Sequence, residues 1–248
     1  MTKVSVDIDY IKEGLKNIGY EISDLKERDN NGKNWQFKFA NSGAIVTVYD
    51  NNNMNNSVVN GRAESEEKEA LKQIVDSLKA KDLIISPLNS EIVNLIKSNK
   101  EDYYYDFKRE FYENKADFLH DILCLSNNTE NKDAYLIIGV TDEDHQVVGV
   151  DKEIKSNDIF DFIKEKEFAG DRVPEIEVFK MYYTYKPIYV IKCKSSKNVP
   201  FYLEKNYRDV CAYQIYTRTG DTNTPKNKQA NYCDVEKLWQ IHFEREND

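Results

Sequence analysis

The stretch Glu101-Asp102-Tyr103-Tyr104-Tyr105-Asp106-Phe107-Lys108 is followed by a second acidic run at residues 139–143, Gly-Val-Thr-Asp-Glu. One expected helix and one expected strand separate the two runs. Successive side chains of a straight strand point to opposite faces, so Glu101 and Asp106 can converge only at a bend or bulge, or if one of them lies in the turn that leads into the strand. With Asp142 at the end of the neighbouring strand, three carboxylates would then surround one point.

Three converging carboxylates suit a divalent metal ion. Mg²⁺ and Mn²⁺ take hard oxygen ligands, usually a few carboxylates together with water and substrate phosphate. An open position beside such an ion is typical of phosphodiester cleavage. Because 32% of the residues are charged, the spacing alone leaves open the alternative of a solvated acidic surface.

The chain from residue 87 onward alternates between helix and strand patterns. Strands are expected at residues 101–110, 135–140, 146–150, 175–184, 187–194 and 212–218, and helices at residues 91–100, 115–126, 157–168 and 235–244. Hairpins between several of these strands indicate a largely antiparallel or mixed sheet. Residues 87–248 are therefore expected to form an α+β domain.

Residues 1–86 are expected to form a separate small α+β domain, because the turn-forming stretch around Pro87 marks a boundary. The pattern predicts a helix at 10–18, strands at 35–39, 44–49 and 57–61, a polar Asn-rich loop at 50–56, and an amphipathic helix at 64–80. This order resembles the helix-grip units of TATA-binding-protein-like domains that are attached to several nucleases. A small domain that binds a partner protein, or packs against the next domain, is the alternative.

Several motifs of the second domain occur together in one order. They are Glu101-x-x-x-x-Asp106-Phe107-Lys108, the expected helix at 116–127, the Gly-Val-Thr-Asp run that ends at Asp142, and the stretches 147–150, 199–203, 216–225 and 235–239. Together they resemble the Schlafen-type, AlbA-like domain of bacterial proteins. The resemblance runs from residue 101 to residue 239.

The resemblance implies a metal-dependent endoribonuclease. In the nuclease branch of that family, two acids of an E-x-x-x-x-E-F-K motif and one acid of G-V-x-D form the catalytic site. By motif these are Glu101, Asp106 and Asp142, with Mg²⁺ or Mn²⁺ as cofactor, and Lys108 is a candidate phosphate contact. Asp106 departs from the more usual Glu, and residues 131–134 replace the usual Gly-Gly.

The resemblance also implies a substrate and a role. Structured RNA, transfer RNA above all, is the implied substrate, and a toxin or anti-phage effector is the implied role. A regulatory nucleic-acid-binding module without catalysis is the alternative. ATP hydrolysis is disfavoured, because the chain has no G-x-x-x-x-G-K-[ST] loop to cradle phosphates.

The charge distribution bears on RNA binding. The net charge of −9 argues against a chain that is basic throughout. Basic residues nevertheless outnumber acids near the C-terminus, and the candidate RNA contacts are Lys192, Lys194, Lys197, Lys205, Arg208 and Arg218. A scatter of solubilising charges is the alternative. Residues 103–105 could stack on an unpaired base, although aromatic residues of a strand more often pack in a core.

The composition of the chain indicates the compartment in which the protein functions. The 40% of hydrophobic residues suffice for a core, the apolar runs are too short to span a membrane, and the N-terminus lacks a signal segment. A cytoplasmic protein without membrane association is therefore expected. Four cysteines without a C-x-x-C pair argue against a zinc ribbon.

A single AlbA-like lobe offers little surface to enclose a structured RNA, so we expect a homodimer. The alternative is that residues 1–86 help to bind the substrate.

Overall fold

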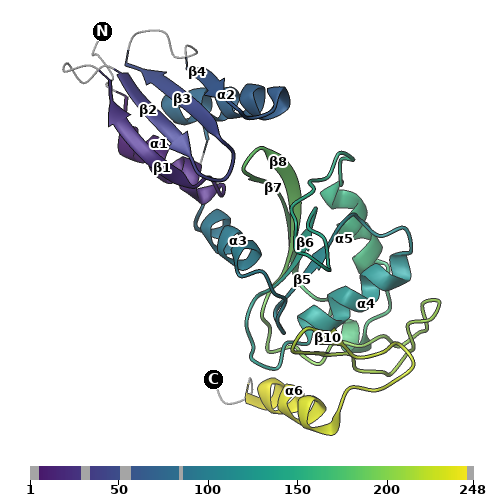
Figure 1. Cartoon of the computed structure of the whole chain (residues 1–248). Helices are drawn as coiled ribbons and strands as arrows, with labels where there is room; N and C mark the ends of the chain where they lie inside the picture. The colour runs from purple at the N-terminus through teal and green to yellow at the C-terminus, as the bar shows by residue number, and fades with distance from the viewer. Residues whose placement is uncertain (1–5, 29–33, 51–56, 84–85, 245–248) are drawn as a thin grey trace. The chain divides into compact units, whose positions relative to one another are not determined.

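The computed structural model describes residues 6–28, 34–50, 57–83 and 86–244. Contacts divide the chain into two units (Figure 1). The first comprises Met1–Ser98 with Tyr182–Lys186, and the second comprises Asn99–Met181 with Pro187–Asp248. The sequence placed the boundary between residues 86 and 87, and residues 84–85 of that stretch lie outside the described residues.

The first unit is a four-stranded antiparallel sheet with helices. Its elements are α1 (Ile8–Asn17), β1 (Ile22–Glu27), β2 (Asn34–Phe39), β3 (Ala44–Tyr49), β4 (Val58–Gly61), α2 (Ser65–Ala80) and α3 (Pro87–Lys97), with strand order β1-β2-β3-β4. Asp7 caps α1 by accepting a hydrogen bond from the Tyr10 N–H, and Ser86 caps α3 by accepting one from the Leu88 N–H. Leu15, Phe37 and Leu71 belong to one buried core that α1, α2 and the sheet share.

Helix α3 belongs to the first unit because its side chains contact α1 and the segment between α1 and β1. The Ser90 hydroxyl donates to Asn17 Oδ1, and Lys97 Nζ lies 3.2 Å from Glu21 Oε1. These contacts explain why the division falls after residue 98. The expected loop at 50–56 lies, from residue 51 onward, outside the described residues.

The second unit is built around a mixed sheet with strand order β5-β6-β8-β7. Its elements are β5 (Tyr105–Lys108), α4 (Lys115–Ser126), β6 (Ala134–Ile138), α5 (Ser156–Lys164), a 3₁₀ turn at Ala169–Asp171, β7 (Ile176–Tyr183), β8 (Lys186–Cys193), the short pair β9 (Arg218–Thr219) and β10 (Thr222–Asn223), and α6 (Tyr232–Glu244). Strand β5 pairs in parallel with β6, and β6 pairs antiparallel with β8. The fold is therefore α+β, as expected.

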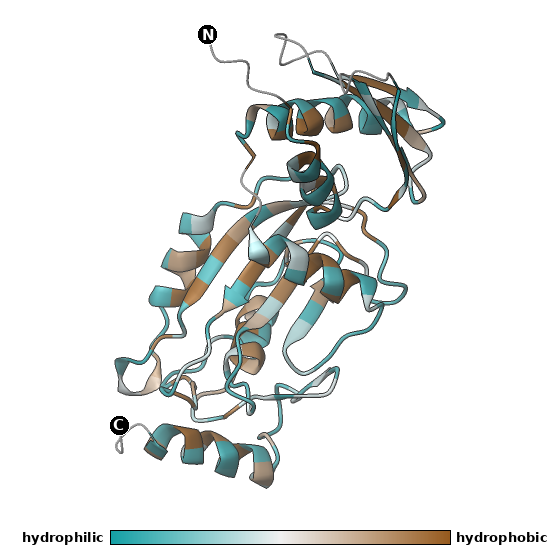
Figure 2. Ribbon diagram, turned by 90° about the vertical axis from the view of Figure 1, so that its left-hand side faces the viewer, coloured by the Kyte–Doolittle hydropathy of each residue, from teal (hydrophilic) through white to brown (hydrophobic). Residues whose placement is uncertain are grey.

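The parallel pair requires a crossover, and α4 provides it. All five residues of β6 are buried, and hydrophobic and hydrophilic residues both occur along the strands of this sheet (Figure 2). Helix α4 is buried almost from end to end and shares its core with β6 and β8. Among the described residues, no helix has the length and hydrophobicity needed to cross a membrane.

Candidate functional site

The site begins at the turn that precedes β5. The Tyr105 N–H donates to the Asp102 carbonyl oxygen over 3.3 Å, which closes a turn directly after Glu101. The turn brings the Glu101 side chain back alongside the strand, where its Oε1 accepts a hydrogen bond from the Phe107 N–H over 2.9 Å. Glu101 and Asp106 converge because one of them lies in the turn that leads into the strand, one of the three arrangements that the spacing allowed.

Arg218 links these two acids. Its Nη2 atom lies 2.6 Å from Glu101 Oε2 and 3.2 Å from Asp106 Oδ1, and its side chain is only 2% exposed. The Arg218 Nε–H also donates to the Asp102 carbonyl over 2.9 Å, and Nη1 donates to Asn223 Oδ1 over 2.9 Å. The sequence proposed Arg218 as an RNA phosphate contact, with a structural role as the alternative, and the structure places it inside the acidic site.

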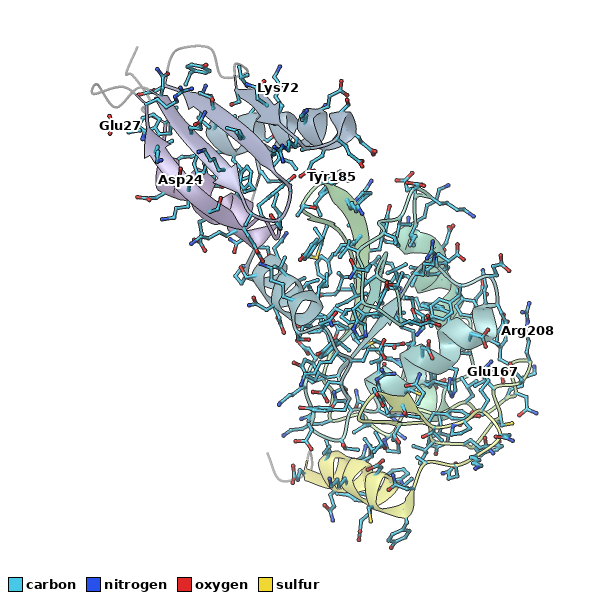
Figure 3. The ribbon with its side chains drawn as sticks, viewed as in Figure 1. Asp24, Glu27, Lys72, Glu167, Tyr185 and Arg208 are labelled. Atoms are coloured by element: carbon cyan, nitrogen blue, oxygen red, sulfur yellow. The ribbon has the colours of Figure 1, made fainter. Side chains whose placement is uncertain are left out.

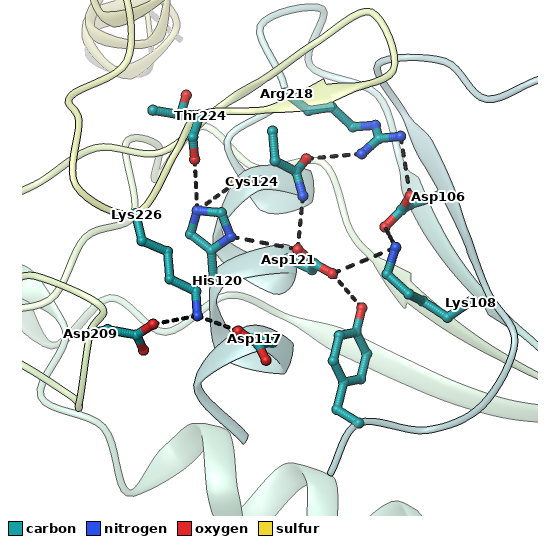
Figure 4. Close-up of polar contacts among 12 residues, drawn as sticks. Asp106, Lys108, Asp117, His120, Asp121, Cys124, Asp209, Arg218, Thr224 and Lys226 are labelled. Carbon is teal, nitrogen blue, oxygen red and sulfur yellow. Dashed lines mark hydrogen bonds and ion pairs between the residues drawn. The ribbon is translucent and has the colours of Figure 1, made fainter. Parts of the chain in front are cut away.

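Lys108 continues the cluster on the other side of Asp106. Its Nζ atom lies 2.7 Å from Asp106 Oδ2 (Figure 4) and 3.7 Å from Asp142 Oδ2. Burial alone would lower the pKa of Lys108, but the negative charges of Asp106 and Asp121 outweigh that effect and raise it. Lys108 therefore stays protonated at neutral pH.

Asp142 reaches the cluster from the end of β6. Gly139 follows β6 with a φ of 106°, and a Cβ atom there would lie 3.1 Å from side-chain carbons of Ile188 and Val150. Glycine therefore allows the chain to leave the strand and turn toward Asp142. The Asp142 side chain is 54% exposed, in contrast to 3% for Asp106, so the cluster opens to solvent at Asp142.

Asp121 on α4 is a fourth acid of the cluster, and the sequence did not predict it. Its Oδ2 accepts a hydrogen bond from the Tyr112 hydroxyl and lies 3.9 Å from Lys108 Nζ, and its Oδ1 accepts one from Asn223 Nδ2 over 2.8 Å. Burial alone would raise the pKa of Asp121, but the neighbouring His120 ring, whose Nδ1 lies 3.6 Å from Asp121 Oδ1, and the charge of Lys108 lower it. The available signal was the pair His120-Asp121 inside an otherwise apolar stretch of helix.

The remaining polar contacts of α4 hold the fold together (Figure 4). His120 Nε2 lies 2.8 Å from the Thr224 carbonyl oxygen, so this nitrogen carries the proton and donates. Burial raises the pKa of the neighbouring Cys124 thiol well above its ordinary value, which leaves it unreactive. Lys226 pairs with Asp117 and with Asp209, so it ties the helix to the loop before β9. None of these groups faces the acidic cluster except through Asp121.

The carboxylates of this cluster suit a hard cation such as Mg²⁺, but in the structure they form ion pairs with Arg218 and Lys108. Among the described residues, no group of three or more His, Cys, Asp or Glu side chains is arranged to hold a metal ion. Arg218 instead joins Glu101 to Asp106, and Lys108 joins Asp106 to Asp142. Burial, and then the negative charge of Asp106, raises the pKa of Glu101 to about 7.

One buried atom of this cluster fits a bound cation. Asp106 Oδ2 is buried, and its cationic partner is the Lys108 ammonium group 2.7 Å away. Carboxylate oxygens of this kind are what Mg²⁺ and Mn²⁺ bind. For Glu101, Asp106 and Asp142 to share one ion, the Lys108 side chain has to leave Asp106.

Most of the expected RNA contacts lie apart from this cluster and have acidic partners. Lys192 Nζ lies 2.7 Å from Asp133, Lys194 Nζ lies 3.0 Å from Glu177, and Lys205 Nζ lies 3.3 Å from Glu167. Glu167 and Arg208 both lie at the surface (Figure 3), and Arg208 donates to Asn114 Oδ1 over 2.7 Å. Lys197 is half-buried in the loop after β8. Ion pairing thus reduces the positive charge that these lysines present to a phosphate backbone.

The three consecutive tyrosines mainly serve packing. Tyr105 is 1% exposed and Tyr104 packs against the core of the second unit. Tyr103 is half-buried, and its hydroxyl accepts a hydrogen bond from Lys132 Nζ over 3.0 Å. Tyr105 is therefore not available to stack on an RNA base.

The family model described as Schlafen, AlbA_2 matches residues 101–227. The match covers just over half of the chain and begins at Glu101, so it includes all four acids, Lys108 and Arg218. A comparison with curated proteins found no match, and a comparison with solved structures found none either. A domain of this family indicates a function that involves nucleic acid and is consistent with a nuclease. The chain belongs to the Schlafen AlbA_2 family.

Proposed function

We propose that the chain is a metal-dependent endoribonuclease whose catalytic residues are Glu101, Asp106, Asp142 and Lys108. One observation carries this proposal: the side chains that the family motif singles out meet in one cluster, although they come from a turn, a strand and a hairpin. Lys108 Nζ contacts both Asp106 and Asp142, and Arg218 Nη2 contacts both Glu101 and Asp106. Acids buried at this depth are retained at a cost in stability, which is typical of functional sites.

Glu101, Asp106 and Asp142 would hold one Mg²⁺ or Mn²⁺ ion. When bound, the ion supplies charge neutralisation at the scissile phosphate and activation of a water molecule. The phosphate approaches from the exposed side, where Asp142 lies. Lys108 stays protonated and, once released from Asp106, binds a phosphate oxygen. Arg218 is too deeply buried to touch RNA, so its role is to hold Glu101 and Asp106 in place.

The finer parts of the proposal rest on the family resemblance. The substrate that we propose is structured RNA, with transfer RNA as the first candidate, and the role is that of a toxin or anti-phage effector. A homodimer would place two such sites around one RNA. The cytoplasm is the proposed compartment, and the four cysteines, all free, support a reducing environment.

A regulatory nucleic-acid-binding module without catalysis is the second candidate. The observation that favours it is the pairing of the acids with Arg218 and Lys108, because two cations already compensate the buried carboxylates. Such a cluster can be a structural element that needs no metal ion.

Incubation of the purified chain with total RNA separates the two candidates. The nuclease predicts discrete fragments with Mn²⁺ or Mg²⁺ and intact RNA with EDTA. Binding of RNA without cleavage under any of these conditions would instead favour the regulatory module. The fragment ends then identify the RNA and the cleavage position.

A further inference from the structure

A cavity of about 670 Å³ lies in the second unit between the segment that follows β5, helix α4 and helix α5. Its wall contains the aromatic rings of Phe111, Tyr112, Phe118 and Phe162 and the aliphatic side chains of Val150 and Ile159. A volume of this size is typical of sites for small molecules or single nucleotide units. Neither the family motif nor the acidic cluster accounts for this cavity.

The cavity adjoins the acidic cluster through direct contacts. Tyr112 lines the cavity, and its hydroxyl donates to Asp121, whose Oδ2 lies 3.9 Å from Lys108 Nζ. Arg109, which also lines the cavity, follows Lys108 directly in the chain. Val148 also lines the cavity, and its N–H donates to the Gly139 carbonyl over 2.8 Å, so this part of the lining belongs to the hairpin that leads to Asp142.

Two aromatic rings of the wall remain accessible. Phe111 and Tyr112 are half-buried, with ring centroids 5.9 Å apart and ring planes perpendicular. Both rings pack against the buried Phe118, at 5.3 Å and 5.5 Å, which fixes their orientation. Rigid and partly exposed aromatic rings of this kind are what single-stranded nucleic acid uses for base stacking.

The charges around the cavity favour a neutral ring over a polyphosphate. The basic side chains on its lining are Arg109, Lys115, Lys152 and Lys155, and the acidic ones are Glu110, Glu113, Asp151, Glu153 and Asp158. This acidic excess disfavours a triphosphate inside the cavity. Within the described part of the chain, none of the four basic side chains has a carboxylate within ion-pair distance, whereas Lys192 and Lys194 do.

We propose that this cavity receives one unpaired nucleobase of the RNA, splayed out of the strand beside the acidic cluster. The base stacks on the Phe111 ring with the perpendicular Tyr112 ring beside its edge, and Arg109 and Lys115 contact phosphates of the flanking nucleotides. This inference rests on the proposed function, since it assigns the nucleotide next to the cut phosphate to a defined pocket. It predicts a preference for cleavage at unpaired positions of a structured RNA.

Binding of a single-stranded RNA octamer, measured by fluorescence anisotropy in EDTA, tests the pocket independently of catalysis. Phe111→Leu keeps an apolar side chain against Phe118 but removes the stacking ring, so affinity should fall roughly tenfold or more. Phe111→Tyr should restore the affinity. Val148→Glu, at a position that is 38% exposed, places a negative charge on the cavity lining and should also weaken binding without disturbing the core.

Octamers in which one base at a time is replaced by an abasic residue supply the second measurement. One abasic position should weaken binding to the wild-type chain as much as Phe111→Leu does, and it should have no further effect on that variant. Unchanged affinity in both Phe111→Leu and Val148→Glu, or no binding of RNA at all, would overturn the pocket. If RNA binds through Phe111 but stays intact with Mn²⁺, the proposed nuclease activity is wrong and the base pocket is supported. If RNA is cleaved and Phe111→Leu leaves the cleavage unchanged, the base pocket is wrong and the nuclease activity is supported.

Discussion

At the scale of single residues, Asp121 is the side chain that organises both cations of the site. It lies 3.9 Å from Lys108 Nζ, and it holds Asn223, which in turn accepts a hydrogen bond from Arg218. Asp121→Asn keeps the shape of the side chain and removes its charge. We expect kcat for RNA cleavage to fall about 10- to 100-fold with KM nearly unchanged, because such supporting groups orient the reacting ones.

Asp117→Asn is the matched control for Asp121→Asn. Asp117 lies on the same helix and pairs with Lys226, away from the acidic cluster. Its substitution should leave kcat near the wild-type value. Equal losses of activity in the two variants would show that α4 matters only for folding.

Arg218 is the residue whose removal should cost the most stability. Arg218→Met leaves the buried Glu101 beside Asp106 without its compensating cation, so the free energy of unfolding at pH 7.5 should fall by about 3–5 kcal/mol. Burial and the charge of Asp106 raise the folded pKa of Glu101 above its ordinary value, and without the opposing charge of Arg218 this pKa rises further. Stability is then lost as pH rises through the folded value, and the deficit should shrink at pH 5. Urea unfolding at both pH values measures it, and a deficit that is larger at pH 5 would contradict this explanation.

The sequence could predict the identities in the site better than their surroundings. Glu101, Asp106 and Lys108 lie in one local motif and Asp142 lies in a second, so spacing together with the resemblance singled them out. Arg218 is buried because β9 lies beside the turn before β5. This contact joins distant parts of the chain, so no local sequence pattern predicts it. For the same reason charge counts favoured an open basic surface, although several of those lysines are paired with acids from distant parts of the chain.

At the scale of helices and strands, helix α2 has one buried acidic residue among its buried apolar side chains. Glu67 is 6% exposed, no hydrogen bond reaches its Oε1, and burial raises its pKa. A raised folded pKa contributes stability below the unfolded value and loses it as pH rises through the folded value. Glu67→Gln should therefore raise the free energy of unfolding by about 1 kcal/mol at pH 8 and change it little at pH 4.

Thermal unfolding of Glu67→Gln at these two pH values provides the measurement. Glu66→Gln, at an exposed position of the same helical turn, is the control and should be neutral at both. A destabilised Glu67→Gln at pH 8 would mean that the ionised carboxylate makes favourable contacts in the folded state.

A predicted strand is absent where side chains, and not a neighbouring strand, form the hydrogen bonds to the backbone. The strand expected at 212–218 is a loop that reaches strand geometry only at Arg218. Its backbone groups bond to side chains instead, since the Ile215 N–H donates to Gln229 Oε1 and Asn127 Nδ2 donates to the Tyr216 carbonyl. Alternating polarity cannot distinguish such a loop from a strand.

Other differences follow from length and exposure. The strand expected at 101–110 is confined to β5, because the turn at Asp102 precedes it, and the strand expected at 146–150 forms only one bridge, between Val140 and Val147. The helix expected at 157–168 ends at Lys164. Strand β1 escaped prediction because it is a mostly exposed edge strand without an apolar alternation. The long buried elements α4 and β6, in contrast, lie where the apolar runs indicate.

At the scale of the whole molecule, the second unit carries one acidic cluster. If structured RNA is the substrate, one such lobe needs a second surface, and we expect a homodimer. Light scattering of the purified chain at micromolar concentration, free and with RNA, should give the mass of two chains. A monomeric mass in both states would contradict the dimer and assign the gripping of RNA to residues 1–86.

The measurement that tests the nuclease most directly compares RNA cleavage by the wild-type chain, Asp142→Ala and Glu143→Ala in Mn²⁺. Both substituted residues lie in the same exposed turn, but only Asp142 contacts the acidic cluster, through Lys108. Loss of one ligand should reduce the cleavage rate by about a thousandfold or more, with unchanged thermal stability, while Glu143→Ala should cleave like the wild type. Cleavage by Asp142→Ala at the wild-type rate would contradict the assignment of this cluster as the catalytic site.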